Sequence, residues 1–187
     1  DAVDLFKKHG ARVEGDVVYI SREMLENALK TVPKSYDLYD RDGGHITVGG
    51  GAPMVYESCY GPIWVRQGDK YEKSTHEHLV NFHKLNETSK VIDMSNPYVL
   101  DVQYVEPEVR QQYALGVALK YCKKPMDGIV LGGEETVREC LEAMQQFYGI
   151  YDKTILTGMA CTVGPMQMAR EMCEAVKVLS AANQCIL

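Results

Sequence analysis

The stretch from Gly128 to Gly149, GIVLGGEETVRECLEAMQQFYG, indicates the fold class most clearly. It opens with four uncharged residues, Gly128 to Leu131, which are typical of a strand buried on both faces. Gly132 and Gly133 then lead into a segment whose apolar residues recur at helical spacing. Those residues are Val137, Leu141, Met144 and Phe147. The stretch therefore predicts one strand and one amphipathic helix, which Gly149 closes as a C-terminal cap.

The same pattern occurs on both sides of this stretch. Between residues 90 and 187 a strand is followed by a helix three times, and Cys185 begins a fourth strand. The first strand and its loop occupy residues 91–102, and Pro165 starts the third helix. Near-continuous apolar strands separated by amphipathic helices predict a parallel sheet with right-handed crossovers. A doubly wound sheet and a (β/α)8 barrel are both compatible with this pattern.

Residues 1–89 have a different character, because their predicted elements are short and antiparallel. A hairpin turns at Gly15–Asp16. Ser74 and Glu77 form a capping box that starts a helix near the end of this region. We therefore predict an α/β chain with an N-terminal α+β lobe, residues 1–89, and a β/α region, residues 90–187.

A glycine-rich and aromatic segment, residues 49–65, lies within the lobe and has the sequence GGGAPMVYESCYGPIWV. Tyr56, Tyr60 and Trp64 recur in it at every fourth position, and Trp64 is the only tryptophan of the chain. Aromatic faces attract cations, and aromatic cages bind quaternary ammonium groups. Aromatic side chains also pack in hydrophobic cores. The segment therefore predicts either a cation-binding cage or a packed hairpin.

Composition narrows the range of partners. The 187 residues carry a formal net charge of -6, and an acidic chain without clustered lysine and arginine is a poor nucleic-acid binder. No apolar run reaches the ~20 residues of a membrane span. Six scattered cysteines without a CxxC pair favour a reducing compartment. We expect a cytoplasmic protein that contacts neither nucleic acid nor membrane.

Neither a metal site nor a phosphate site is favoured by the motifs. His76 and His78 point to different sides of their predicted helix, and His83 is two turns from His76, so we expect a solvated helix face instead of shared metal ligands. The Gly132–Gly133 pair opens a helix, where an anion can bind. The two glutamates that follow in the first turn oppose an anion there.

Several segments carry a family resemblance in their order and spacing. They are GARVEG at 10–15 with VVYIS at 17–21, ALKTVPKSYDLYDRD at 28–42, GGG at 49–51, SNP at 95–97 and KKP at 123–125. Together they resemble the trimethylamine methyltransferase family, the corrinoid-dependent enzymes that demethylate trimethylamine, glycine betaine and similar amines. The resemblance covers essentially the whole chain, although none of these segments is a catalytic signature.

The resemblance implies a TIM barrel for the complete protein. A barrel needs roughly 250 residues, so this chain would supply the lobe and about the first three β/α units, truncated before the half that carries pyrrolysine in the trimethylamine enzymes. The implied reaction moves a methyl group from trimethylamine or a quaternary amine to cobalt. The corrinoid that holds this cobalt is carried by a partner protein, and no cofactor is bound directly.

The implied substrate pocket lies at the C-terminal ends of the barrel strands. Because a quaternary ammonium donates no hydrogen bond, aromatic faces and carboxylates must hold it. We expect substrate contacts from seven residues, namely Tyr56, Glu57, Tyr60, Trp64, Asn96, Gly132 and Cys161. Asn96 would bind the carboxylate tail of a betaine. Packing is the alternative role for Cys161, because no partner base is evident.

Two other functional classes remain open. The chain could be a non-catalytic module that binds the amine or docks the corrinoid protein, and betaine binding without methyl transfer would select this reading. It could also be a structural α/β domain in which the aromatic segment is a packed hairpin. A half barrel leaves open sheet edges and an apolar face, so we expect self-association.

Overall fold

The computed structural model describes residues 2–164 and 166–187. Within this range the chain forms two compact units, one that ends at Tyr36 and one that runs from Asp37 to Leu187. Every residue that is buried within the described range belongs to the second unit. The second unit therefore contains the hydrophobic core.

The first unit consists of two helices and a hairpin. Its elements are α1 (Ala2–Lys8), β1 (Arg12–Glu14), β2 (Val17–Tyr19) and α2 (Arg22–Thr31). The hairpin turns at Gly15, whose φ of 62° favours glycine, and its strands pair antiparallel as predicted. Ser21 caps α2, because its Oγ accepts a 3.1 Å hydrogen bond from the amide of Met24.

Two further antiparallel pairs follow along the chain. β3 (Ser35–Tyr39) pairs with β4 (His45–Gly49), and β5 (Trp64–Gln67) pairs with β6 (Lys70–Lys73). The short pairs confirm the mixed, antiparallel character that the sequence predicts for this part of the chain.

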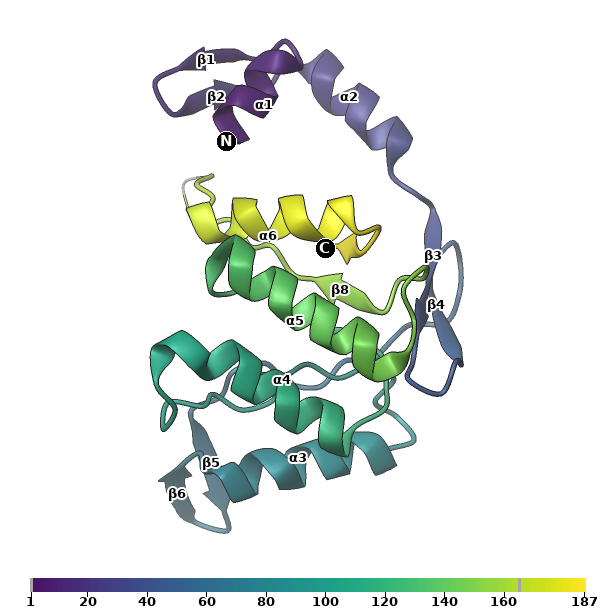
Figure 1. Cartoon of the computed structure of the whole chain (residues 1–187), viewed down its shortest axis with the longest axis vertical. Helices are drawn as coiled ribbons and strands as arrows, with labels where there is room; N and C mark the ends of the chain where they lie inside the picture. Colours follow the sequence, from purple (N-terminus) through teal and green to yellow (C-terminus); the bar gives the residue numbers. More distant parts are fainter. Residues whose placement is uncertain (1, 165) are drawn as a thin grey trace. The chain divides into compact units, whose positions relative to one another are not determined.

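Four longer helices lie side by side in chain order within the second unit (Figure 1). They are α3 (His76–Thr88), α4 (Arg110–Tyr121), α5 (Gly133–Tyr148) and α6 (Arg170–Ala181), and a 3-10 turn, η1 (Pro107–Val109), precedes α4. Each of these four helices packs against the next one along the chain. No helix in the described residues is both long and apolar enough to cross a membrane.

Two predicted helix starts differ from the structure. The N-cap of α3 is Thr75, whose Oγ1 accepts a hydrogen bond from the His78 amide at 3.3 Å. Ser74 is not the cap, because its hydroxyl instead donates to the carbonyl oxygen of Asp101. The helix predicted to start at Pro165 begins at Arg170 in the structure, and Pro165 itself lies outside the described residues.

A parallel sheet lies behind these helices. Its strands are β7 (Met126–Asp127), β8 (Leu156–Gly158) and β9 (Cys185–Ile186), which pair in chain order. Two isolated parallel bridges extend the order, since Ser95 pairs with Met126 and Glu57 pairs with Met94. The predicted parallel sheet and the predicted strand at Cys185 are confirmed. The strand order of a doubly wound sheet reverses at one point, and the described strands show no such reversal. The described residues form no closed barrel.

The first two predicted strands are wrong in their extent. The strand expected within residues 91–102 makes only the bridges at Met94 and Ser95. The strand expected at Gly128 to Leu131 is a loop, and the strand itself ends at Asp127. The reason is the backbone, because Gly128 and Ile129 have φ values of 105° and 56°, which no regular strand accommodates.

Apolar side chains fill the space between the sheet and the helices. Met126 and Leu156 are partners in the sheet register, are fully buried, and belong to a core cluster with residues of α5 and α6 such as Met144 and Leu179. Successive residues of a strand point to opposite faces. The residues that follow Met126 and Leu156 therefore lie on the sheet face that is turned away from these helices.

Candidate active site

Three buried polar residues form a row on the face of the sheet that is turned away from the helices. Asp127 and Thr157 are register partners, and both are fully buried. Asn96 is also fully buried, and it follows Ser95 in the chain. Ser95 pairs with Met126 and accepts a 2.8 Å hydrogen bond from Asn86 of α3, so Ser95 lies on the helix-facing side and Asn96 on the other side. The row lies at the C-terminal ends of the parallel strands, where binding sites of parallel β/α proteins occur.

Asn96 holds Glu57 at this row. The Asn96 Nδ2 atom lies 3.0 Å from Glu57 Oε1, 3.2 Å from the carbonyl oxygen of Cys59 and 3.4 Å from Ser58 Oγ. An amide nitrogen has two hydrogens to donate, so these acceptors use its full capacity. The Asn96 Oδ1 atom is buried, and no donor of the described residues reaches it. It is an open acceptor in the site.

Glu57 and Asp127 form a pair of interacting carboxyl groups. Burial raises the pKa of Asp127 to about 7, and the negative charge of Glu57 adds to the rise. Burial also raises the pKa of Glu57, and the hydrogen bond from Asn96 opposes that rise. Two carboxyl groups that share one site resist ionising together. Asp127 is therefore largely protonated below pH 7 and increasingly ionised above it.

Tyr60 lies over the loop that follows β7. A Cβ atom added to Gly128 would lie 3.8 Å from Tyr60 Cε2, which is ordinary van der Waals contact, and it is the φ of 105° that favours glycine at this position. The Tyr60 ring also lies beside that of Tyr98, with 6.1 Å between ring centroids. Burial raises the pKa of Tyr60 to about 12, and the charge of Asp127 contributes. The neutral phenol remains 43% exposed, which leaves ring surface for a ligand.

The backbone is strained directly after Asp127. Ile129 is fully buried and has a φ of 56°, a conformation that β-branched residues rarely adopt. Such a residue costs on the order of 1–3 kcal/mol, and strain of this kind clusters at functional sites. The Gly128–Ile129 turn gives the strand a sharp end at Asp127.

Tyr56 and Trp64 occupy different positions from Tyr60. The backbone of Tyr56 exchanges hydrogen bonds with Asp93, at 2.8 Å to its amide and 2.8 Å to its carboxylate, and its side chain is 50% exposed. Trp64 starts β5 opposite Lys73 and is 55% exposed. The ring contacts in the described residues join Tyr60 to Tyr98 but join none of the three aromatics to one another.

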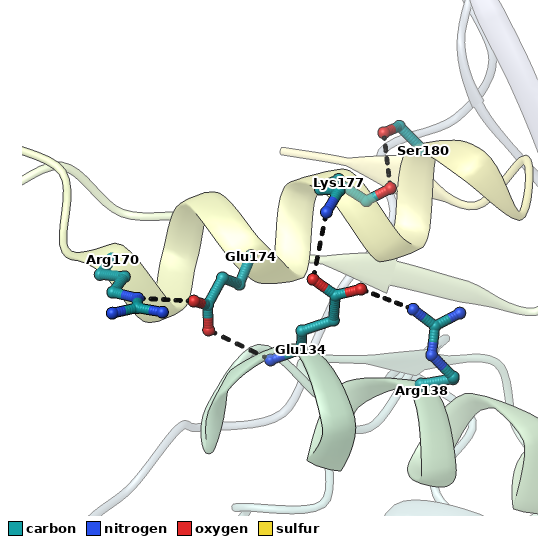
Figure 2. A network of polar contacts seen from close by, with 6 residues as sticks. All are labelled: Glu134, Arg138, Arg170, Glu174, Lys177 and Ser180. Atoms are coloured by element: carbon teal, nitrogen blue, oxygen red, sulfur yellow. Dashed lines mark hydrogen bonds and ion pairs between the residues drawn. The ribbon is translucent and has the colours of Figure 1, made fainter. Parts of the chain in front are cut away.

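Gly132 shapes the start of α5, and the anion position there is already filled. Gly132 is the N-cap at a φ of 87°, and the Glu134 amide donates a 3.3 Å hydrogen bond to Glu174 Oε2 of α6. Figure 2 shows that Glu174 is held in turn by Arg170, at 2.7 Å. Glu134 pairs with two cations, Arg138 and Lys177, at 2.7 and 3.2 Å. A protein carboxylate therefore takes the place that a phosphate would need.

Cys161 follows β8 and is exposed, so it does not pack in the core. An electrostatic interaction with Cys161 is among the causes that raise the pKa of Tyr60. All six cysteines of the chain lie within the described residues, and all are free thiols.

The three histidines of α3 have separate environments. His76 Nδ1 lies 2.6 Å from the Tyr113 hydroxyl, and His78 Nε2 lies 3.1 Å from the Gln67 side chain. His83 is fully buried, which contradicts the solvated face expected for it, and burial lowers its pKa to about 4. The described residues contain no group of three or more His, Cys, Asp or Glu side chains that could hold a metal ion.

Sequence reasoning missed Asp127. The structure brings together three residues that it did predict, Glu57, Tyr60 and Asn96, and adds Asp127 from β7. The available signal was the Asp127–Gly128 dipeptide, because Asp-Gly marks a turn and a carboxylate before such a turn ends a strand. A strand at Gly128 to Leu131, as the sequence predicts, leaves Asp127 before the strand, whereas the observed strand ends on Asp127.

Comparison with known proteins gives the site its context. The family model for trimethylamine methyltransferase (MTTB) matches residues 1–187. A proline betaine:corrinoid methyltransferase of Eubacterium limosum is 29% identical over 195 residues, which cover 98% of this chain and 40% of that protein. An L-carnitine:corrinoid methyltransferase of the same organism is 30% identical over 185 residues, covering 91% of this chain and 37% of that protein.

A third relative, a glycine betaine methyltransferase of Desulfitobacterium hafniense (strain Y51), is 27% identical over 191 residues, which cover 100% of this chain and 40% of that protein. The chain thus spans 37–40% of the length of these three relatives. Since the family model matches the chain from end to end, the chain belongs to the trimethylamine methyltransferase family.

Proposed function

We propose that this chain is the N-terminal part of a methyltransferase that moves a methyl group from a methylated amine to the cobalt of a corrinoid on a partner protein. Family membership supports the class of reaction. The names of three relatives, which specify proline betaine, L-carnitine and glycine betaine, favour a quaternary amine that also bears a carboxylate. The corrinoid would supply the cobalt that accepts the methyl group, and the residues described above would hold the amine.

The observation that carries this proposal is the Glu57–Asp127 pair beside Tyr60. A quaternary ammonium has a positive charge spread over methyl groups and no hydrogen to donate. The half-buried Glu57 and the buried Asp127 supply carboxyl groups whose negative charge attracts that cation, and an aromatic ring contributes roughly 0.5–2 kcal/mol to binding a cation. This chemistry suits an ammonium group better than it suits a metal ion, because the described residues offer no third carboxylate, histidine or cysteine to complete a metal site.

In this proposal Asn96 acts through Glu57. Its two amide hydrogens are engaged by Glu57 and neighbouring acceptors. Binding the carboxylate tail of a betaine would break one of those hydrogen bonds, so we assign Asn96 to positioning Glu57 and expect the tail to be bound by another donor. Tyr56, Trp64, Gly132 and Cys161 stay predicted substrate contacts, and none of them is a member of the row formed by Asn96, Asp127 and Thr157.

We further propose that residues 90–187 are the first β/α units of a (β/α)8 barrel and that residues 1–89 form a separate α+β lobe. Parallel strands in chain order and helices that pack in the same order support this architecture. The polar row would then face the barrel interior. Closure would need more strands than the described residues supply, from the rest of the protein.

The test uses the complete protein with its reduced corrinoid partner and follows methylation of the cobalt by visible absorption. Glycine betaine, L-carnitine and trimethylamine are offered separately. Asp127→Asn and Glu57→Gln are expected to reduce kcat/KM at least tenfold. Asp152→Asn is the control, because Asp152 is exposed, lies between α5 and the start of β8, and is not one of the residues assigned to the site; it should retain full activity.

Two results would contradict the proposal. Betaine binding without methylation by the wild-type protein would select the non-catalytic binding or docking module. Absence of both binding and methylation would select a structural domain in which the aromatic segment only packs.

A further inference from the structure

The environment of Asp127 has a deficit of hydrogen-bond donors. Both carboxyl oxygens of Asp127 are buried, and neither has a hydrogen bond of good geometry within the described residues, although the neighbouring Gly128 amide acts to lower the pKa of Asp127. The side chain that interacts with them is Glu57, which is itself an acceptor held by Asn96. Asn96 Oδ1 is a third buried acceptor without a donor. The side chains around these three oxygens therefore supply them with no positive charge and no donated hydrogen.

Two facing carboxyl groups can satisfy each other only when one of them is protonated. The protonated group then donates to the ionised one. This arrangement removes the repulsion between two buried charges, which is costly where water is excluded. The pair therefore lacks a hydrogen-bond donor only when both carboxyl groups are ionised. One proton shared between the two groups supplies the missing donor.

We propose that the Glu57–Asp127 pair holds one proton while the site is empty and releases it to solvent when the ammonium group of the substrate enters. The inference rests on the proposed function, because it takes the ligand to be a methylated ammonium. The entering cation supplies the positive charge that the proton supplied before. No covalent bond to the substrate changes in this step, and the proton passes from the carboxyl pair to water or buffer.

The other groups around the pair do not compete for this role. Tyr60 stays neutral because its pKa is raised to about 12. Cys161, which also interacts electrostatically with Tyr60, lies after β8 and is an exposed thiol. The interactions that set the pKa of Asp127 in the described part of the chain include no lysine, arginine or histidine. The value of about 7 for Asp127 places its proton exchange within the range of ordinary binding experiments.

Proton release makes binding depend on pH in a defined direction. Below the pKa of the pair, each unit rise in pH strengthens binding by up to about tenfold, because one proton must leave for each ligand that binds. Above that pKa the pair is already ionised, and the affinity becomes independent of pH. A site that binds the ammonium without proton exchange would show the same affinity throughout.

The test is isothermal titration calorimetry of the complete protein with glycine betaine. This probe has a fixed positive charge and an ionised carboxylate between pH 5.5 and pH 8.5, so any proton exchanged belongs to the protein. Titrations at one pH in two buffers that differ in ionisation enthalpy give the number of protons released. We expect about one proton per betaine near pH 6 and close to none near pH 8.5.

Variants locate the proton. Asp127→Asn should bind betaine more weakly and release no proton, whereas the matched control Asp152→Asn should release the same number as the wild type. If Asp127→Asn does not fold, the proton count and pH dependence of the wild type decide the matter alone. Betaine binding that is independent of pH and of buffer overturns this inference and leaves the proposed function standing. Absence of binding by glycine betaine, L-carnitine and trimethylamine overturns both.

Discussion

Asp127 and His83 are both fully buried, and burial moves their pKa values in opposite directions. The pKa of Asp127 rises to about 7, so its contribution to stability is fully present below pH 3.8 and is lost as pH rises through 7. The pKa of His83 falls to about 4, so its contribution is present above pH 6.5 and is lost as pH falls through 4. Between pH 4 and pH 6.5 the two slopes oppose each other.

Removing one of these groups should expose the slope of the other. For Asp127→Asn we expect the free energy of unfolding to rise with pH between 4 and 6.5, with a slope of up to about 1.4 kcal/mol per pH unit from His83. The wild type should change much less over this range. Urea unfolding at four pH values measures both slopes. A variant that is as flat as the wild type would show that Asp127 does not titrate near neutrality in the folded chain.

Two glycines with different environments give a matched pair of substitutions. Gly128→Ala should destabilise the chain by about 1–2 kcal/mol, because φ is 105° and the new Cβ would lie 3.4 Å from Pro97 Cδ. Gly116→Ala should stabilise it by about 1 kcal/mol, since Gly116 lies within α4 and its added Cβ would meet nothing within 4 Å. Urea unfolding compares the two. Equal effects would contradict the role of Gly128 beside Tyr60.

Sequence reasoning reached part of the site at the residue scale. Aromatic and carboxylate chemistry in residues 49–65 predicted Glu57 and Tyr60, and the polar residue after the first strand predicted Asn96. Which residues meet depends on contacts between positions far apart in sequence, such as the hydrogen bond from Asn96 to Glu57 across 39 positions. Hydrophobic periodicity contains no information on such contacts. It therefore could not place Asp127 beside Glu57, Tyr60 and Asn96.

At the scale of elements, helices were predicted better than parallel strands. The helices satisfy most of their hydrogen bonds within one segment, so residues such as those of α5 show their period in the sequence. β7 has two residues and β8 has three, and their pairing partners lie some 30 residues away. Their ends are set by the turn at Gly128 and Ile129 and not by apolar content.

Glu174 contributes a polar link between α5 and α6, beside their apolar packing and the Glu134–Lys177 ion pair. Glu174 of α6 accepts from the Glu134 amide at the start of α5 and pairs with Arg170 (Figure 2). Hydrogen bonding to Arg170 is the main reason why the pKa of Glu174 is lowered. The stabilisation is therefore present above the unfolded pKa of Glu174 and is lost as pH falls through the folded value.

For Glu174→Ala we expect faster hydrogen exchange at the Glu134 amide and a lower unfolding temperature, because an N-terminal amide of α5 loses its acceptor. Glu142→Ala is the control, since Glu142 is an exposed residue of α5. Amide exchange followed by NMR at pH 7 makes the comparison. Unchanged protection of Glu134 in the Glu174 variant would mean that the cap does not form in solution.

At the scale of the whole molecule, the core belongs to one of the two units. The first unit has no buried residue in its described range, whereas the second contains two apolar clusters between its helices and sheet. A chain that begins at Ser35 should therefore keep the helical circular dichroism of α3 to α6 and a cooperative thermal transition. Residues 2–34 as a peptide should show no cooperative transition. A cooperative transition of the peptide would contradict this division.

The parallel pairing of the strands followed from the repeated strand and helix pattern, and the structure confirms it for β7, β8 and β9 and adds their order. Whether these strands close into a barrel could not be read from the same pattern, because a sheet closes only when its first and last strands meet. The relatives are more than twice as long as this chain. The architecture of the complete protein therefore remains a proposal that rests on this order.

The central claim is that the Glu57–Asp127 pair and the Tyr60 ring receive the methylated ammonium of the substrate. A crystal structure of the complete protein with glycine betaine bound tests it most directly. We predict that the trimethylammonium group contacts the Tyr60 ring and lies beside the carboxyl groups of Glu57 and Asp127. A betaine bound with its ammonium group away from all three side chains would contradict the claim.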